Sequence, residues 1–214
     1  MRKRIAEGSA IQRTIKLKEI MIPTKQIRAL FTDKTIRVYQ AYCDEIADPA
    51  LQSQTFVSPF GRSRMTWIKP SFLWMMYRAG YGFKDPNQRR ILAIDITHEG
   101  FAWALNHSCG SKPPSHLNKQ EWKNLKENTP VRIQWDPERD SKHNALDYRS
   151  IQIGLSGEAV ERYVDDWIQG ISEVTDLAHE IFDLVGKDKL AEAAKLCPSE
   201  RVYDLYSDVD QLGG

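Results

Sequence analysis

The stretch Arg64-Met-Thr-Trp-Ile-Lys-Pro-Ser-Phe-Leu-Trp-Met-Met-Tyr-Arg-Ala-Gly80 decides the fold, because it contains the most apolar run of the chain. Pro70 fixes a φ angle that suits the start of a helix, and Gly80 supplies a left-handed stop. The residues between them are apolar, or nearly so, on every side, which is typical of a helix in the protein centre. The helix is too short to span a bilayer. The stretch therefore predicts a short buried helix around which the other elements are arranged.

Polar residues stand at the entrance to this helix. Arg64, Thr66 and Lys69 border a short predicted strand over residues 65–68. Two interpretations of these side chains are open: they are solvated groups at the ends of a core element, or they form part of a ligand site. Clustered polar groups mark functional sites only in a fraction of cases, so the sequence alone does not choose between the two.

The length and charge of the chain set broad limits on its class. With 214 residues it is long enough for one domain with a substantial core. We expect a mobile arm over residues 1–24, a single globular domain over residues 25–206 and a loose tail over residues 207–214. The 30 Lys and Arg residues are balanced by 29 Asp and Glu residues, so bulk charge argues neither for nor against nucleic-acid binding. A local basic patch remains compatible with this balance.

The cysteines and the apolar segments indicate the compartment. Cys43, Cys109 and Cys197 are far apart and follow no metal-binding spacing. A scattered, odd-numbered set is typical of reduced thiols rather than of a disulfide framework. The basic N-terminus has no apolar segment behind it, and no run is long enough to cross a bilayer. We therefore expect a cytoplasmic protein without a metal site and without a membrane partner.

The order of the predicted elements indicates the fold class. Alternating residues predict strands at 35–42, 131–135 and 150–155, and a nearly continuous apolar run predicts a central strand at 91–96. Helical patterns follow most of these strands. We predict a single α/β domain of the α+β type, with a curved or split mixed sheet and surrounding helices. A doubly wound parallel sheet is the alternative.

Two further segments carry local predictions. Residues 136–140, Asp-Pro-Glu-Arg-Asp, are predicted to form a solvated acidic turn, because Asp before Pro commonly opens turns. A charged rim around a site is the alternative interpretation. Ser156 is expected to cap a helix whose apolar stripe runs over residues 160–168.

Several common chemistries have no motif in this chain. There is no Gly-rich phosphate loop and no Gly-x-Ser-x-Gly nucleophile elbow. The five histidines lie in separate predicted elements, so they do not have the spacing of a zinc site.

The chain resembles the domain-of-unknown-function family numbered 4291 over residues 25–206. The segments that carry this resemblance are 26–29, 35–42, 64–78, 131–140, 149–160 and 198–203. Their motifs are highly specific, but the family supplies little information on function.

A weaker resemblance, to ADP-ribosyltransferase-like domains, implies a function. These domains open with a strand that ends in a Tyr-His-Gly-Thr type motif, and Val38-Tyr-Gln-Ala-Tyr42 is similar to it. Their middle motif is a strand that leads to a buried helix, and Thr66-Trp-Ile-Lys-Pro-Ser-Phe-Leu-Trp74 resembles the proline-containing version in the DNA-modifying branch. They finish with a strand that carries the catalytic Glu and leads through a turn to a helix. Residues 152–160 have that shape.

This resemblance implies a transferase that binds NAD or a related nucleotide, with nucleic acid as the acceptor. The catalytic positions would be Gln40, Arg64 and Gln152. Arg37 and Gln40 would hold ribose or phosphate, Thr66, Trp67 and Lys69 would line the nicotinamide side, and Arg64, Arg139 and Arg149 would bind phosphates. The full set of implied cofactor-binding residues is Arg37, Tyr42, Thr66, Trp67, Lys69, Arg139 and Arg149.

The sequence departs from this pattern at two positions. Gln40 stands where the His is expected and Gln152 where the catalytic Glu is expected. An amide cannot supply the charge with which a carboxylate stabilises the transition state. Two alternatives are therefore open: a binding module for nucleic acid or a phosphorylated ligand, and an enzyme of the RNA 2′-phosphotransferase type, which relies on arginines. We also expect that Arg37, Arg64, Thr66, Lys69 and Arg149 converge on one cleft, because each lies at a strand start or end.

Overall fold

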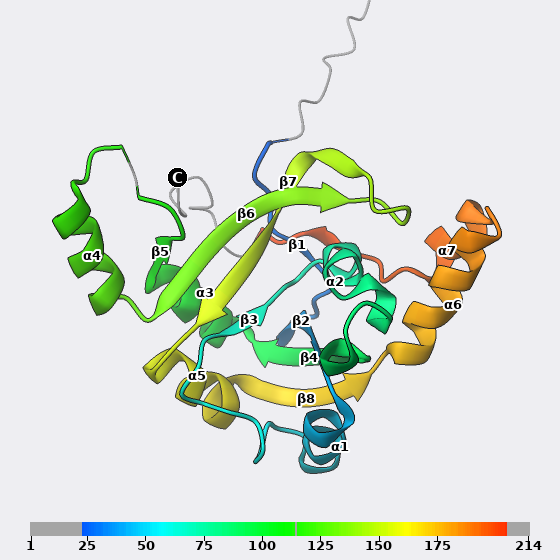
Figure 1. Cartoon of the computed structure of the whole chain (residues 1–214), viewed down its shortest axis with the longest axis horizontal. Coiled ribbons are helices and arrows are strands. Elements are labelled where there is room, and N and C mark those ends of the chain that lie inside the picture. Colours follow the sequence, from blue (N-terminus) through cyan, green and yellow to red (C-terminus); the bar gives the residue numbers. More distant parts are fainter. Residues whose placement is uncertain (1–22, 114, 205–214) are drawn as a thin grey trace, which may run out of the picture.

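The computed structural model describes residues 23–113 and 115–204 (Figure 1). The predicted tail, and all but the last two residues of the predicted arm, lie outside this part. The described residues form one α/β domain in which helices surround several sheets. The prediction of a single mixed α/β domain is confirmed.

The strands and helices have the following bounds. The strands are β1 (Arg28–Ala29), β2 (Thr35–Tyr42), β3 (Thr66–Ile68), β4 (Arg90–Thr97), β5 (Ser108–Gly110), β6 (Val131–Arg139), β7 (Ala145–Leu155), β8 (Ile168–Glu173) and β9 (Arg201–Val202). The α-helices are α1 (Asp44–Ser53), α2 (Phe72–Ala79), α3 (His98–Asn106), α4 (Lys119–Asn128), α5 (Glu158–Arg162), α6 (Thr175–Gly186) and α7 (Leu190–Leu196). Two 3₁₀ turns, η1 (Gly80–Gly82) and η2 (Pro86–Gln88), and a π-helical turn, η3 (Tyr163–Trp167), complete the described elements.

The strands form two main sheets. One has the order β2-β4-β8 and the other the order β3-β7-β6-β5, while β1 and β9 pair separately. All of these pairs are antiparallel except β5 with β6. The described part therefore has no doubly wound parallel sheet.

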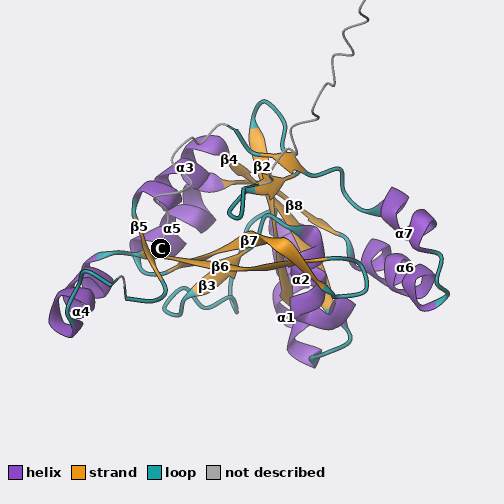
Figure 2. Cartoon of the chain, turned by 90° about the horizontal axis from the view of Figure 1, so that it is seen from above, coloured by secondary structure: helices purple, strands orange, loops and turns teal. Residues whose placement is uncertain are grey.

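The two main sheets meet at a single bridge and then separate. The Tyr39 backbone N–H donates to the Lys69 carbonyl oxygen at 2.7 Å, which links β2 to the residue after β3. Beyond this bridge the end of β2 pairs within one sheet and the start of β3 within the other. The two sheets therefore separate on this side of the bridge. Figures 1 and 2 show β6 and β7 lying across one side of the molecule and β2, β4 and β8 across the other.

β2 alternates its side chains between two cores. Ile36 and Val38 face the larger core, where they join Ile133 and Ile153 of the other sheet. Tyr39 points to the opposite side and joins a second core built mainly from α2, β4, α6 and α7. The period-2 pattern of this strand thus explains why both faces are covered.

The central helix α2 has the ends that the sequence predicts, with one correction to its faces. The Ser71 hydroxyl caps its start by accepting from the Trp74 backbone N–H, and Gly80 ends it in the left-handed region at φ 57°. Most of its side chains are buried, but Tyr77 and Arg78 are exposed on one face. The helix is therefore buried on most sides rather than on every side.

The predicted acidic turn at residues 136–140 is wrong for most of its length. β6 continues through this segment to Arg139 and pairs with β7, with an irregular register between Pro137 and Arg139. Proline lacks the N–H that a regular ladder needs, and an irregularity in the register accommodates it. Glu138 is 5% exposed, so this part of the segment is core rather than solvated turn.

The helix predicted after Ser156 is correct in position, but its cap and its end differ from the prediction. The Ser156 hydroxyl donates to the Pro130 carbonyl oxygen instead of capping, and α5 begins after Gly157, whose φ is 52°. The apolar stripe continues through the π-helical turn, but Ile168 already belongs to β8.

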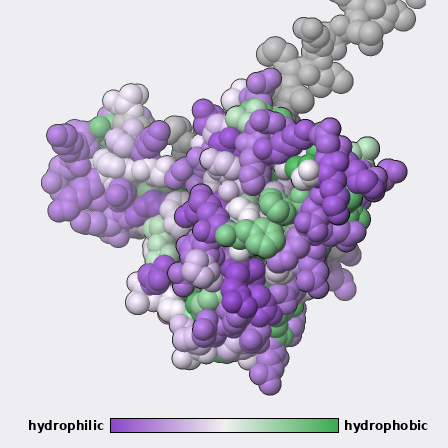
Figure 3. Space-filling model, turned by 45° about the vertical axis from the view of Figure 1, so that its right-hand side comes forward, coloured by the Kyte–Doolittle hydropathy of each residue, from purple (hydrophilic) through white to green (hydrophobic). Residues whose placement is uncertain are grey.

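The surface is mainly hydrophilic on the face drawn in Figure 3, with small separate hydrophobic patches. None of the helices in residues 23–113 and 115–204 combines the length and the hydrophobicity needed to cross a membrane.

Candidate functional site

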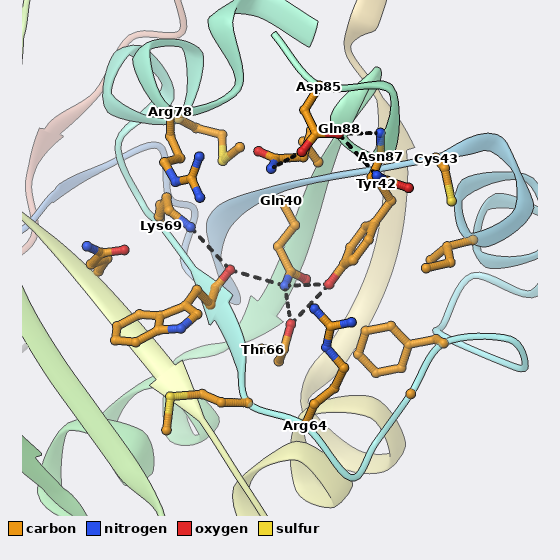
Figure 4. A pocket seen from close by; sticks show the side chains of 18 of the residues that line it. Gln40, Tyr42, Cys43, Arg64, Thr66, Lys69, Arg78, Asp85, Asn87 and Gln88 are labelled. Carbon is orange, nitrogen blue, oxygen red and sulfur yellow. Dashed lines mark hydrogen bonds between the residues drawn. The ribbon is translucent and has the colours of Figure 1, made fainter.

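A cavity of about 870 Å³ opens where the two sheets separate (Figure 4). The end of β2 and the start of α1 form one wall, and residues 59–67 form another. The 85–88 segment, α2, and side chains from β6 and β7 complete the lining. A cavity of this size is typical of small-molecule and nucleotide sites.

Gln40 forms the centre of a buried polar network at the cavity wall. Its side chain is 3% exposed. Its Nε2 lies 2.7 Å from the Thr66 hydroxyl, 2.9 Å from the Tyr42 hydroxyl and 3.2 Å from the Trp67 carbonyl oxygen, and its Oε1 accepts from the Tyr163 hydroxyl at 2.8 Å. The protein therefore satisfies both ends of the amide, and Gln40 fixes the orientation of its neighbours.

The hydroxyl groups around Gln40 remain protonated at neutral pH. Burial raises the pKa of Tyr42 to about 12, although its contact with Thr66 acts in the opposite direction. The two hydroxyl oxygens lie 3.0 Å apart. Because Tyr42 and Thr66 both line the cavity, they offer it neutral hydrogen-bonding groups held in place by Gln40.

Gln152 has a defined amide orientation. Its Nε2 donates to an Asp136 carboxylate oxygen at 2.6 Å, across the β6–β7 pair. Gln134 donates to the same carboxylate at 3.0 Å. This contact uses one of the two Gln152 N–H groups and orients the amide, so its Oε1 is available to a ligand as an acceptor.

Cations dominate the charge of the cavity lining. Arg64, Lys69 and Arg78 line it, whereas Asp85 is the one carboxylate among the described lining residues. Asp85 accepts from the Asn87 backbone and side chain at 2.9 and 3.1 Å. Neither Arg64 nor Arg78 makes a hydrogen bond or ion pair with another described residue. This excess of positive charge favours an anionic ligand, and free guanidinium groups match phosphate oxygens in geometry.

Lys69 is the most unusual of these cations. Its side chain is 6% exposed, and burial lowers its pKa to about 7. The positive charge of Arg78 lowers the pKa further, and the Asp136 carboxylate partly opposes the shift. Close to neutral pH, the lysine is therefore present in both the charged and the neutral form.

Seven of the predicted site residues line this cavity: Gln40, Tyr42, Arg64, Thr66, Trp67, Lys69 and Gln152. They come from β2, the residues around β3, and β7, which are far apart in the sequence. Figure 4 shows Gln40, Tyr42 and Thr66 pointing toward one another, with Arg64 beside them and Lys69 beside Arg78.

The other three predicted residues lie elsewhere. Arg37 forms a two-point ion pair with Asp95 on the neighbouring strand β4, at 2.7 and 2.9 Å, because it points away from the face that carries Gln40. The Arg139 guanidinium lies 4.0 Å from the ring centroid of Tyr77. Of the five residues expected to converge on one cleft, the main cavity therefore brings together Arg64, Thr66 and Lys69 but not Arg37 or Arg149.

Arg149 lies at a second, smaller pocket and not at the main cavity. Its Nη1 donates to the Trp135 carbonyl oxygen at 3.0 Å. The pocket has a volume of about 280 Å³ and is also lined by Lys25 and Lys112. Gln134 lines both this pocket and the main cavity, so the two adjoin.

Sequence reasoning missed several residues of the site. Arg78 belongs to the stretch that decides the fold and directly follows the apolar run. A basic residue in the last turn of a helix is common, so its position does not indicate a ligand site. The Asp-Pro pair predicts a turn at Asp136, and a residue in a solvated turn is not expected to contact Gln152 on another strand. The 85–88 segment carries only turn residues, and nothing in its pattern indicates that it closes over the end of β2.

No group of three or more His, Cys, Asp or Glu side chains in the described residues is arranged to hold a metal ion.

The separated sheets and the cation-lined cavity between them define a single-domain α/β protein among the described residues. The chain belongs to the family described as Domain of unknown function (DUF4291), whose model matches residues 26–203. This match confirms the family that the sequence motifs indicate. No curated protein matches the chain.

Proposed function

We propose that the main cavity binds NAD or a related nucleotide, and that the protein transfers ADP-ribose from it to a nucleic-acid acceptor. One observation carries this proposal. The three segments that resemble ADP-ribosyltransferase motifs, on β2, β3 and β7, are far apart in sequence, yet Gln40, Thr66 and Gln152 line the same cavity. A split sheet is also the arrangement that the resemblance implies.

The charged groups of the cavity suit a dinucleotide. Arg64 and Arg78 have no carboxylate partner among the described residues and are available to the diphosphate. Trp67 offers an aromatic face to the nicotinamide ring, and Gln152 offers its Oε1 to a ribose hydroxyl. In the transfer, the bond between ribose C1′ and the nicotinamide nitrogen breaks, nicotinamide leaves with the electron pair, and an acceptor oxygen or nitrogen bonds to C1′ and loses a proton.

The main chemical objection to a transferase is that Gln152 stands where the resemblance implies a catalytic glutamate. Gln152 itself carries no charge, but Asp136 lies 2.6 Å from its amide nitrogen. A carboxylate that polarises this amide makes the Oε1 a better acceptor and places negative charge close to the reacting ribose. The pair Gln152–Asp136 thus replaces part of what a single glutamate provides.

The second pocket supports a nucleic-acid acceptor. It adjoins the cavity at Gln134 and carries Lys25, Lys112 and Arg149. A basic groove beside the reacting centre is suited to a polynucleotide backbone.

A direct test is NAD turnover, measured as nicotinamide release with no acceptor, with RNA, with 2′-phosphorylated RNA and with DNA. We expect release to depend on one of these nucleic acids and to be lost in Arg64→Ala. The matched control is Lys123→Ala, which removes one positive charge from the exposed helix α4. No nicotinamide release above buffer with any acceptor would overturn the transferase function.

A binding module is the second candidate, and the Gln40 network favours it. Both ends of that amide are satisfied within the protein, so Gln40 has no free group for chemistry. In a binding module, Arg64→Ala weakens affinity for a nucleotide and reduces its salt dependence together. In an enzyme, the same substitution lowers turnover more than binding.

A further inference from the structure

Lys69 lies in the cavity without a counter-ion. Its Nζ makes only a long, weak hydrogen bond, donated to the Trp67 carbonyl oxygen at 3.5 Å. The same nitrogen lies 5.5 Å from the ring centroid of Trp74. No carboxylate of the described residues forms an ion pair with it. A buried ammonium normally has such a partner, because desolvating an unpaired charge is costly.

The charges that face Lys69 favour its neutral form. Arg78, from α2, stands beside it in Figure 4 and repels a second positive charge. Asp136, from β6, attracts that charge but is already bonded to Gln134 and Gln152. With its pKa lowered to about 7, Lys69 is neutral far more often at pH 7 than an ordinary lysine, whose pKa is about 10.4.

A neutral amine in an open cavity is a nucleophile rather than an anion-binding group. Desolvated lysines with lowered pKa values are the lysines that form imines with carbonyl compounds. Lys69 lines the cavity, so its side chain borders the space in which a ligand would lie. The amides of Gln134 and Gln152 line the same cavity and are available to hydroxyl groups of such a ligand.

Arg64 is the cation of the cavity that stands apart from Lys69, whereas Arg78 stands beside it (Figure 4). Arg64 precedes β3 and Lys69 follows it, so five residue steps along an extended chain separate their backbones by about 17 Å at most. Both side chains reach into the same cavity, and Arg64 has no partner among the described residues. A ligand with a phosphate at one end and a sugar at the other fits this arrangement.

We propose that Lys69 is a nucleophilic lysine that forms an imine with the aldehyde of a phosphorylated pentose bound between it and Arg64. The nitrogen lone pair attacks the aldehyde carbon and forms the C–N bond. The amine nitrogen gives up its two protons, the carbonyl oxygen takes up two and leaves as water, and the product is the imine; no electron donor or acceptor is needed. The inference deepens the proposed function. It rests on that function only for the choice of a pentose as the sugar, because the open-chain ribose of ADP-ribose is an aldehyde of this kind.

Reductive trapping tests this inference. The full chain is incubated with ribose 5-phosphate, ADP-ribose or unphosphorylated ribose in the presence of cyanoborohydride, which reduces an imine to a stable amine. Peptide mass mapping then locates the adduct. We expect one main adduct on Lys69, with a rate that rises to half its maximum near pH 7. Both phosphorylated sugars should react at least tenfold faster than ribose.

Matched variants separate the roles of the two cations. Lys69→Arg keeps the charge but should abolish the adduct, while Lys142→Arg, at an exposed lysine that pairs with Asp188, should not change it. Arg64→Ala should leave Lys69 reactive and remove the preference for phosphorylated sugars. Since the position of the adduct, its pH dependence and the preference for phosphorylated sugars are all measured in the wild-type chain, a poorly folding Lys69→Arg does not prevent the test.

Two results would overturn the inference. One is an adduct distributed over exposed lysines, with Lys69 modified no faster than they are. The other is equal trapping of ribose and ribose 5-phosphate by the wild type. If ADP-ribose binds by calorimetry but Lys69 is not trapped, this inference fails and the nucleotide site stands. If Lys69 is trapped with ribose 5-phosphate but neither NAD nor ADP-ribose binds, the proposed function fails and the lysine site stands.

Discussion

The Gln152 side-chain amide on β7 donates a 2.6 Å hydrogen bond to the Asp136 carboxylate on β6. This contact fixes which end of the amide faces the cavity. It also holds a carboxylate next to an amide that lines the cavity. Any ligand contact at Gln152 is therefore influenced by Asp136 as well.

The first prediction concerns this pair. Gln152→Glu places two carboxylates within hydrogen-bonding distance, and like charges at that separation oppose each other. We expect the variant to lose about 1–2 kcal/mol of unfolding free energy at pH 8 and to recover part of it at pH 5, where the pair holds a proton. Urea unfolding at both pH values measures this. The control is Gln152→Glu combined with Asp136→Asn, which should regain wild-type stability; an equally unstable double variant would contradict the explanation.

The second prediction concerns Glu200, whose carboxylate accepts from the Phe72 backbone N–H at 2.7 Å. Burial raises its pKa to about 8, and the nearby Glu138 adds to the shift. Because the pKa of Glu200 is higher in the folded than in the unfolded state, its protonated carboxyl stabilises the folded state below pH 4.5. This stabilisation is lost as the pH rises to about 8.

Glu200→Gln should remove this pH dependence while keeping an oxygen for Phe72. Each pKa unit corresponds to about 1.4 kcal/mol, so we expect the wild type to lose a few kcal/mol relative to the variant between pH 5 and pH 8. Urea midpoints across this range measure the difference, with the exposed Glu180→Gln as control. Parallel curves for wild type and Glu200→Gln would show that the carboxyl is not perturbed.

The third prediction follows from the lowered pKa of Lys69. Below pH 7 the buried group is charged in the folded and the unfolded state, so the folded state carries the full desolvation cost. As the pH rises from 7 to 10.5, the folded state releases its proton first, and the stability of the wild type increases relative to a variant without the group.

Lys69→Met tests this sign, because methionine fills a similar volume without a charge. We expect the variant to be more stable than the wild type at pH 6 by about 1–4 kcal/mol, and this advantage to shrink toward pH 10. The measurement is the difference in unfolding free energy across pH. A variant that is less stable than the wild type at pH 6 would indicate that the ammonium is stabilised by its surroundings.

The fourth prediction concerns the cavity wall. A Cβ on Gly154 would lie 2.7 Å from the Met65 sulfur and 3.0 Å from the Trp67 ring, so Gly154→Ala must displace these side chains. Because Trp67 lines the cavity, we expect affinity for ADP-ribose to fall roughly tenfold, or about 1.4 kcal/mol. Calorimetry measures the affinity. Gly186→Ala, where a Cβ meets nothing within 4 Å, is the control and should bind as the wild type does.

Local sequence patterns were sufficient for much of the fold. The strand at Thr35–Tyr42 has the predicted bounds, and the hydroxyl of Thr97 caps α3 by accepting from the Gly100 backbone N–H, three residues away. These features depend on neighbours within four residues, where alternation and capping chemistry are visible.

Features that depend on distant partners were not visible in the sequence. Arg37 and Asp95 meet because β2 and β4 pair in one register, and no local pattern specifies that register. The Asp-Pro pair favoured a turn at residues 136–137, but pairing with β7 overrode that preference. Ile168 satisfies both a helical and a strand pattern, and its pairing with β4 decides between them.

The central claim is that the cavity is a nucleotide site held by Arg64 and Arg78. The most direct measurement is calorimetric titration of ADP-ribose into the wild type, the Arg64→Ala/Arg78→Ala double variant and Lys123→Ala. We predict saturable binding to the wild type and to Lys123→Ala, and affinity at least tenfold weaker in the double variant. Absence of binding to a folded wild type, or equal affinity in the double variant, would contradict the account.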